Sequence, residues 1–196
     1  MSDFKWLNES KATESPGKIT LLATEKSDFF CNPAAAGEDG ITPESLSNAP
    51  FYYLDVTGDF VMKANVSHEF KAVYDAASIL VMENARVWAK ACFELTDFNT
   101  RAVVSVVTNQ TSDDANGCNI DGDSVWLQVV RVGQAFGFHY SEDGENFRMM
   151  RVFALPVGKT VKVGLLAQSP IGPGGERHFE KFSLENRTVK NIRSGR

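Results

Sequence analysis

Two charged residues, Lys90 and Glu94, interrupt the otherwise apolar segment VWAKACFEL at positions 87–95. In a helix they would form an ordinary surface pair. In a strand they would lie together on one face of a sheet, because neighbouring side chains point to opposite sides. The odd positions from 87 to 95 are all apolar, and this alternation favours a strand. The segment therefore predicts a sheet with one apolar and one polar face, and the polar face can carry chemistry.

Other predicted strands alternate in the same way and add polar or aromatic side chains to the face away from the core. These side chains are Trp88, Trp126, Gln128 and His139, with Gln168 at the end of a later strand. If the strands are neighbours, all of them line one site with Lys90 and Glu94. Sugar binding needs an aromatic platform and polar groups for the hydroxyls. Trp126 or Trp88 would be the platform, and the polar side chains would bind the hydroxyl groups.

The alternative is a solvated outer face without a ligand. On such a face a cross-strand Lys–Glu pair contributes less than about 1 kcal/mol. Removing Lys90 or Trp126 would then leave any binding intact, whereas in a ligand site it would weaken binding.

Metal and nucleophile patterns are weak. The segment DDANGCNIDGD at 113–123 resembles a calcium loop in composition, but twelve residues counted from Asp114 end at Val125, where an EF-hand needs a glutamate. Calcium bound by another geometry and a solvated acidic loop both stay open. The three histidines and three cysteines show no ligand or triad spacing. Apart from that open question of calcium at 113–123, the sequence assigns no metal ligand, no cofactor and no catalytic residue.

Composition limits the class of partner. The 196 residues include 43% hydrophobic and 23% charged residues, which is ordinary for a globular protein, and the net charge is −5. A nucleic-acid partner needs a basic face, so it is not expected. The chain shows no secretory signal and no apolar stretch long enough for a membrane span. Three unpaired cysteines favour a reducing, cytoplasmic setting. Oligomeric state is left open.

The elements that must position these residues are short strands. Turn signals separate roughly a dozen β-like runs, and no helical stripe is present, which predicts a sandwich or a barrel. One domain is expected over 1–196, with a long loop at about 32–50, an acidic loop at 111–124 and a C-terminal tail at about 187–196. Phe179 and Phe182 break the alternation of their strand, which predicts a bulge or the end of the strand there.

The ordered segments YDAASILVMENARVWAKACFEL, VVSVVTNQTSD, VWLQVVRVGQAFGFHYSEDGENFRMMRVF and VKVGLLAQSPIGPGGERHFEKFSLE are similar to a concanavalin A-like family. The family carries the label of a domain of unknown function, and part of it the label "regulation of enolase". The resemblance implies an all-β jelly-roll sandwich of two antiparallel sheets, one of them concave, in a cytoplasmic protein. Ala76, Ser78 and Phe147 depart from the family pattern, so ligand contacts built on those positions are in doubt.

These observations predict a non-catalytic binding module whose concave face binds a carbohydrate or a partner protein, such as a metabolic enzyme that it regulates. The alternative is a glycoside hydrolase or lyase with Glu94 as the catalytic carboxylate. Concanavalin-like glucanases carry their two catalytic carboxylates on one strand, in an E-x-D-x-x-E pattern. That pattern is absent from this sequence, which favours the binding module.

Overall fold

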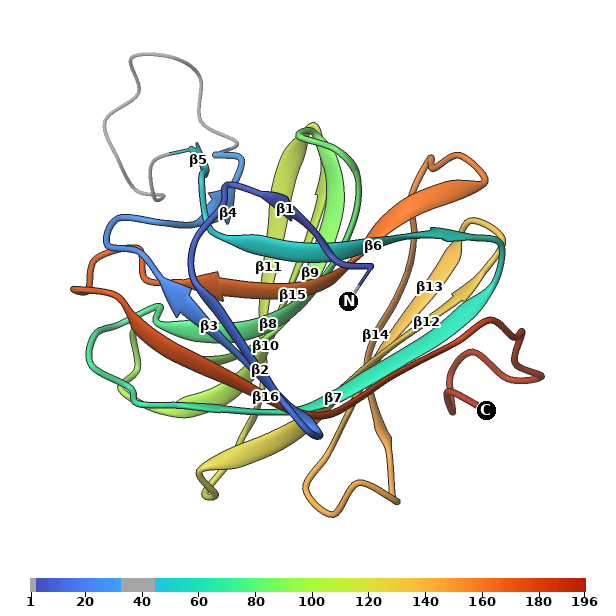
Figure 1. Cartoon of the computed structure of the whole chain (residues 1–196). Coiled ribbons are helices and arrows are strands. Elements are labelled where there is room, and N and C mark those ends of the chain that lie inside the picture. The colour runs from blue at the N-terminus through green and yellow to red at the C-terminus, as the bar shows by residue number, and fades with distance from the viewer. Residues whose placement is uncertain (1–2, 33–44) are drawn as a thin grey trace.

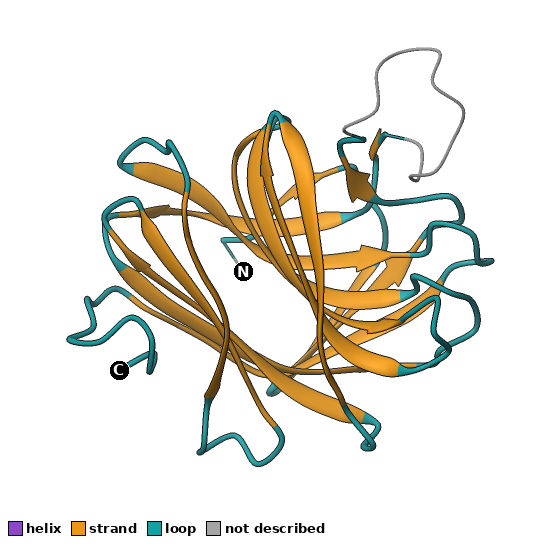
Figure 2. Ribbon diagram, turned by 180° about the vertical axis from the view of Figure 1, so that it is seen from behind, coloured by secondary structure: helices purple, strands orange, loops and turns teal. Residues whose placement is uncertain are grey.

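The computed structural model describes residues 3–32 and 45–196, and within these residues every regular element is a β-strand. Figure 2 shows the strands arranged as two curved layers. Both layers are seven-stranded antiparallel sheets, and a separate pair of short strands lies beside them. The predicted all-β sandwich of two antiparallel sheets is therefore confirmed.

Each sheet combines strands from distant parts of the chain (Figure 1). In spatial order, the first sheet contains β1 (Lys5–Leu7), β6 (Phe51–Thr57), β15 (Thr160–Gln168), β8 (Ala76–Asn84), β9 (Val87–Leu95), β10 (Arg101–Asn109) and β11 (Thr111–Asn119). The second contains β14 (Arg148–Ala154), β13 (Ala135–Ser141), β12 (Ser124–Val132), β7 (Phe60–His68), β16 (Gly175–Glu185), β3 (Lys18–Ala23) and β2 (Ala12–Ser15). The short pair is β4 (Phe29–Phe30) and β5 (Leu46–Ser47).

The main core lies between the two sheets and takes one face of each strand. From β9 it takes the odd residues 87–93, and from β12 it takes 125, 127 and 129. The alternation therefore sorted the two faces of β9 correctly, and Lys90 and Glu94 point away from this core. Burial of apolar side chains between the sheets contributes about 25 cal/mol for each Å² removed from water.

The predicted site residues, however, do not come from neighbouring strands. β9 and β15 belong to the first sheet, whereas β12 and β13 belong to the second. The expectation that Lys90 and Glu94 share a sheet face with Trp126, Gln128 and His139 is therefore wrong. Alternation tells which side of a strand is apolar but not which sheet the strand joins, so two strands with the same pattern can face opposite ways.

The acidic loop expected at 111–124 is largely a strand, because Thr111–Asn119 pairs with β10 at the edge of the first sheet. Most of its side chains are exposed, because an edge strand has a neighbour on one side only. Its polar composition therefore resembles that of a loop, and charged side chains on an edge discourage pairing with other chains. The predicted loop at 32–50 lies partly outside the described residues, and its described part includes β5.

Of the two alternatives predicted near Phe179, the structure has the bulge and not the strand end, since β16 continues to Glu185. The pairing of β16 with β7 shifts register between Glu180 and Ser183. Lys181, inside this shift, has a φ of 52°. Phe179 lies fully buried in the core, and Phe182, also inside the shift, packs against the core.

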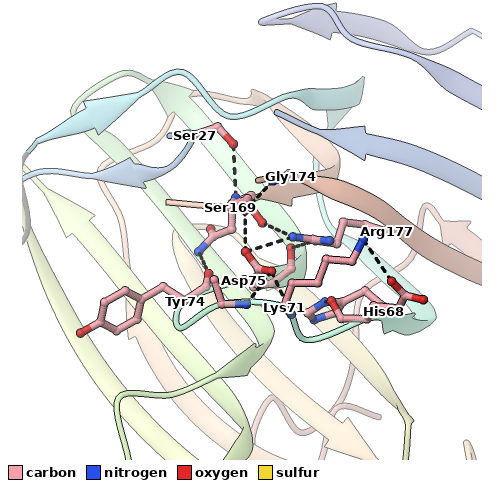
Figure 3. A network of polar contacts seen from close by, with 12 residues as sticks. Ser27, His68, Lys71, Tyr74, Asp75, Ser169, Gly174 and Arg177 are labelled. Carbon is pink, nitrogen blue, oxygen red and sulfur yellow. Dashed lines mark hydrogen bonds and ion pairs between the residues drawn. The ribbon is translucent and has the colours of Figure 1, made fainter. Parts of the chain in front are cut away.

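A buried polar network ties the two sheets together at one end (Figure 3). Arg177 on β16 donates from Nη2 to the carbonyl of Gln168 on β15 at 2.8 Å and lies 3.4 Å from Asp75 Oδ1. Asp75 also accepts the hydroxyl of Ser169 at 2.5 Å and the backbone N–H groups of Lys71 and Ala72. Both buried charges, those of Arg177 and Asp75, have partners, which is what burial of charged groups requires.

We predict that Asp75→Asn lowers the free energy of unfolding by about 3–5 kcal/mol, because it leaves the Arg177 guanidinium buried without a counter-charge. Urea denaturation measures the loss. Asp55→Asn, which breaks the exposed Lys5–Asp55 pair, is the matched control and should cost far less. Equal losses of stability in the two variants would contradict the role of Asp75 as the counter-charge of Arg177.

Candidate functional site

A pocket of about 330 Å³ lies on the outer face of the first sheet, away from the core. Its wall combines charged and polar side chains with apolar ones: Asp28, Phe30, Leu46, Tyr74, Lys90, Glu94, Val106, Asp114, Gln168, Pro170 and Ile171. Sheet register explains how these residues meet. Lys90, Val106 and Asp114 occupy one row across β9, β10 and β11, and Gln168, Ala76 and Glu94 occupy another across β15, β8 and β9.

The small side chain of Ala76 separates Gln168 from Glu94 in their row, and it is fully buried. A methyl group at this position leaves room above the sheet that a larger side chain would occupy. The departure from the family pattern at position 76 thus lies in the floor beneath the pocket.

Lys90 is held in place by two contacts. Its side chain is 2% exposed, and Nζ donates to Asp28 Oδ1 at 2.7 Å and to Gln168 Oε1 at 2.8 Å. Burial acts to lower the pKa of the ammonium, but the negative charges around it, that of Asp28 above all, outweigh this effect and raise the pKa. Lys90 is therefore a permanently charged group whose charge is balanced inside the protein.

Gln168 connects the pocket to the network of Figure 3. Its Oε1 accepts from Lys90, its Nε2 donates to the carbonyl of Tyr74 at 3.1 Å, and its own carbonyl accepts from Arg177. The amide group is thereby fixed in one orientation. Figure 3 shows the ring of Tyr74 directed away from this network, and the ring lines the pocket.

Tyr74 has a φ of +68°, a conformation that few residues other than glycine adopt. Two backbone contacts hold it: its N–H donates to the carbonyl of Leu95 at 2.7 Å, and its carbonyl accepts from Gln168. Such strain costs of order 1–3 kcal/mol and is concentrated at functional sites. It fixes the direction in which the aromatic ring leaves the chain.

Glu94 lies in the pocket without a protein partner. Its residue is 7% exposed, and its carboxyl forms no hydrogen bond or ion pair with any residue of 3–32 or 45–196. Burial raises the pKa of this carboxyl well above its usual range, and nearby Lys90 offsets this only in part. A buried polar group without a partner is costly, so the carboxyl is available to a ligand.

The remaining predicted residues lie elsewhere. Trp88 shares the face of Lys90 but is completely buried in a second apolar cluster, where it packs edge-on against Phe29 with ring centroids 5.8 Å apart. It therefore offers no platform to a ligand.

Trp126, Gln128 and His139 lie on the outer face of the second sheet, across the core from the pocket. The C-terminal tail covers two of them: His139 Nε2 lies 3.0 Å from the carbonyl of Ile192, and Gln128 Nε2 donates to that of Gly195 at 3.4 Å. Trp126 packs under Gly144, whose φ of +80° brings the backbone against the ring. These three residues belong to the packing of the second sheet and its tail.

Sequence reasoning missed Asp28, Asp114 and Tyr74. Asp28 lies between β3 and β4, and only the need of buried Lys90 for a counter-charge could have indicated it. Asp114 belongs to a strand whose polar composition predicts a solvated loop. Tyr74 had a usable signal, since the YD pair at 74–75 opens one of the segments that carry the family resemblance.

Metal-binding clusters and membrane-spanning helices are both absent from the described residues. These residues hold no group of three or more His, Cys, Asp or Glu side chains placed to bind a metal ion. Among them there is also no helix of the length and apolar character needed to cross a membrane.

The fold and the pocket together define a β-sandwich with a polar pocket on the outer face of one sheet. The chain belongs to the family described as "Protein of unknown function (DUF1349)", whose model matches residues 6–187. A relative from Saccharomyces cerevisiae, named "Regulation of enolase protein 1", is 27% identical over 186 residues, which are 94% of this chain and 90% of the relative.

Solved structures share the fold. A functionally unknown protein from Saccharomyces cerevisiae has a TM-score of 0.84 at 25% identity, covering 95% of this chain and 98% of that one. A GH43 protein, BlXynB, from Bacillus licheniformis has a TM-score of 0.71 at 15% identity, covering 93% of this chain but 36% of its own. The carbohydrate binding module CBM66 from Bacillus subtilis has a TM-score of 0.58 at 11% identity, covering 94% and 96%. The last two likenesses concern the fold alone.

We predict that Lys90→Met lowers the free energy of unfolding by about 3–5 kcal/mol, because it leaves the Asp28 carboxylate beside the sheet without its counter-charge. Denaturation of Lys90→Met, Asp28→Asn and the double variant forms a thermodynamic cycle. We expect the double variant to lose less than the sum of the single losses. Strictly additive losses would contradict the buried pair.

We predict that Glu94 makes stability depend on pH. Its pKa is raised in the folded protein, so above about pH 4.3, the usual value for glutamate, the folded state holds a proton that the unfolded state has lost. The contribution of Glu94 to stability is therefore complete below that pH and is lost as pH rises through the folded pKa. Wild type should lose stability relative to Glu94→Gln between pH 5 and pH 8 in urea denaturation. A constant difference would refute this, and Glu145→Gln, on an exposed loop of the second sheet, is the control.

Proposed function

We propose that this chain is a non-catalytic binding module that holds a carbohydrate in the pocket on the first sheet. The observation that carries the proposal is the buried, unpartnered carboxyl of Glu94, which among the described residues faces the same pocket as Lys90 and Gln168. A sugar hydroxyl donates and accepts, and the pocket offers both kinds of group at fixed positions. The pocket volume is in the range of known small-molecule sites.

The apolar part of the pocket supports the same proposal. Phe30, Val106 and Ile171 line it beside the ring of Tyr74. A sugar ring has an apolar face that packs on aromatic and aliphatic side chains, while its edge carries the hydroxyls. The sandwich fold is shared with a protein named as a carbohydrate binding module, which agrees with the proposal at the level of the fold.

A second candidate is a regulatory contact with a metabolic enzyme, favoured by the name of the yeast relative. β9 and β15 run in the same direction, since both are antiparallel to β8, so the loops after them lie at one edge of the sheet. These loops carry Phe98, 75% exposed, and Ile171, 66% exposed. Exposed apolar side chains at this edge of the sheet suit a protein partner. We also propose a cytoplasmic location, which the three free cysteines support.

The glycoside hydrolase or lyase is the remaining alternative. A carboxyl with a raised pKa is typical of a general acid, and Asp114 is a second carboxyl in the same pocket. Product analysis on a glycan panel separates this alternative from binding. Turnover that Glu94→Gln abolishes would establish catalysis and overturn the binding module.

We predict that Tyr74→Ala weakens binding of a glycan ligand, identified on a glycan array and measured by calorimetry, by about tenfold, or about 1.4 kcal/mol, because it removes the aromatic side chain on which the sugar ring packs. Trp126→Ala, on the opposite sheet, should leave affinity unchanged. The reverse result would place the ligand on the second sheet. A pull-down with enolase tests the protein partner, and Phe98→Ser with Ile171→Ser should abolish that contact.

A further inference from the structure

We infer that the pocket selects a carbohydrate that carries a protonated amine, in preference to the neutral sugar and to anionic sugars. This inference rests on the proposed function and adds the charge of the ligand to it. The charges that line the pocket, and the way they are already paired, lead to it.

The positive charge of the pocket is already neutralised. Lys90 is the one cationic side chain among the described residues that line the pocket, and its ammonium is bound by Asp28 at 2.7 Å and by the Gln168 amide oxygen. Three carboxyl groups face this single ammonium. Once Lys90 and Asp28 are paired, the carboxyls of Glu94 and Asp114 remain, so the described lining of the pocket keeps groups that can pair with a cation and none that can pair with an anion.

Glu94 needs a donor from the ligand. Its carboxyl is nine-tenths buried, lines the pocket, and has no partner among the described residues. A hydroxyl would give it one neutral hydrogen bond. An ammonium would give it a charge-assisted bond, which is about twice as strong. The ammonium would also offset the burial cost of the carboxylate, because a buried charge is stable when it is paired.

The other walls tolerate a cation. Asp114 is exposed on the far side of the pocket, on the row of Lys90, and it adds negative potential there. The ring of Tyr74 offers a negative π face, to which an ammonium is attracted. A phosphate or carboxylate on the sugar would find no free cation among the pocket residues that the structure describes, since Lys90 is already paired, and would meet Asp114 with like charge, so anionic sugars should bind weakest.

The selection should depend on pH. The titratable and charged groups around Glu94 are Lys90 and Cys92 on its own strand, Asp97 in the following turn, Asp28, Asp114 and Tyr74. Burial keeps the free carboxyl protonated above its usual range, and a bound ammonium favours the ionised form. Binding of the amine should therefore release a proton, and affinity should rise with pH until the amine itself loses its charge.

The experiment measures binding of four small sugars to the wild-type chain by titration calorimetry. Glucosamine carries the ammonium, glucose lacks it, N-acetylglucosamine keeps the nitrogen without the charge, and glucose 6-phosphate is anionic. We expect glucosamine to bind about tenfold more tightly than glucose, which corresponds to about 1.4 kcal/mol. Repeating the titration in two buffers of different ionisation enthalpy should show proton release for glucosamine alone.

Two variants assign the effect to the pocket. Glu94→Gln keeps the shape of the side chain and should reduce the ratio of glucosamine to glucose affinity to near one. Asp114→Asn, at an exposed position, should reduce it in part and does not risk the fold. Glu145→Gln on the second sheet should leave the ratio unchanged. Circular dichroism confirms that each variant is folded.

Equal affinity for glucose and glucosamine would overturn the inference while leaving the proposed function intact. Binding of methylamine as tight as that of glucosamine would overturn the carbohydrate proposal, because the ring would then contribute nothing. Failure of all four sugars and of methylamine would overturn both. A glucosamine preference that survives Glu94→Gln and Asp114→Asn would place the selectivity elsewhere and refute the inference.

Discussion

The site depends on one requirement: the ammonium of Lys90 lies on a sheet, nearly free of water, and must be neutralised there. Burying a charge without a partner costs several kcal/mol. Asp28 supplies the counter-charge, and this contact draws residues 27–30 across the outer face of the first sheet. Phe29 then packs on Trp88, and Ser27 bonds with Ser169 through their backbones. The pocket exists because this segment lies over the sheet at the ammonium.

The polar contacts that neutralise Lys90 continue to the second sheet. Gln168 satisfies a second proton of Lys90 with its amide oxygen, and its backbone carbonyl accepts from Arg177 on β16. Arg177 is in turn paired with Asp75, beside the strained Tyr74. Lys90, Gln168, Arg177 and Asp75 thus form one chain of polar contacts from the pocket to the junction of the sheets. Networks of this kind are stable only when every member is satisfied, which fixes the pocket geometry as part of the fold.

Sequence reasoning recovered the fold and half of the site, and the division has a physical reason. Alternation along one strand is a local property, so it assigned Lys90 and Glu94 to the outer face and located the bulge after Phe179. The sheet to which a strand belongs depends on pairing between distant segments, which a single sequence does not reveal. The pattern of alternation therefore predicts one face for Trp126, His139 and Lys90, although the first two lie across the core from Lys90. The counter-charge Asp28 is 62 residues from Lys90, beyond the reach of any local pattern.

The two charged residues of the segment at 87–95 have different partners from those that the sequence alone suggests. Lys90 and Glu94 share a face and a strand, yet they do not form the pair that their spacing suggested. Lys90 is neutralised by Asp28, which leaves Glu94 without a cation. Had the two residues paired with each other, the carboxyl of Glu94 would not be a free acceptor in the pocket. Because the remote carboxylate of Asp28 pairs with Lys90, the carboxyl of Glu94 on the same strand has no protein partner within residues 3–32 and 45–196. A ligand of the pocket must therefore supply a donor to Glu94.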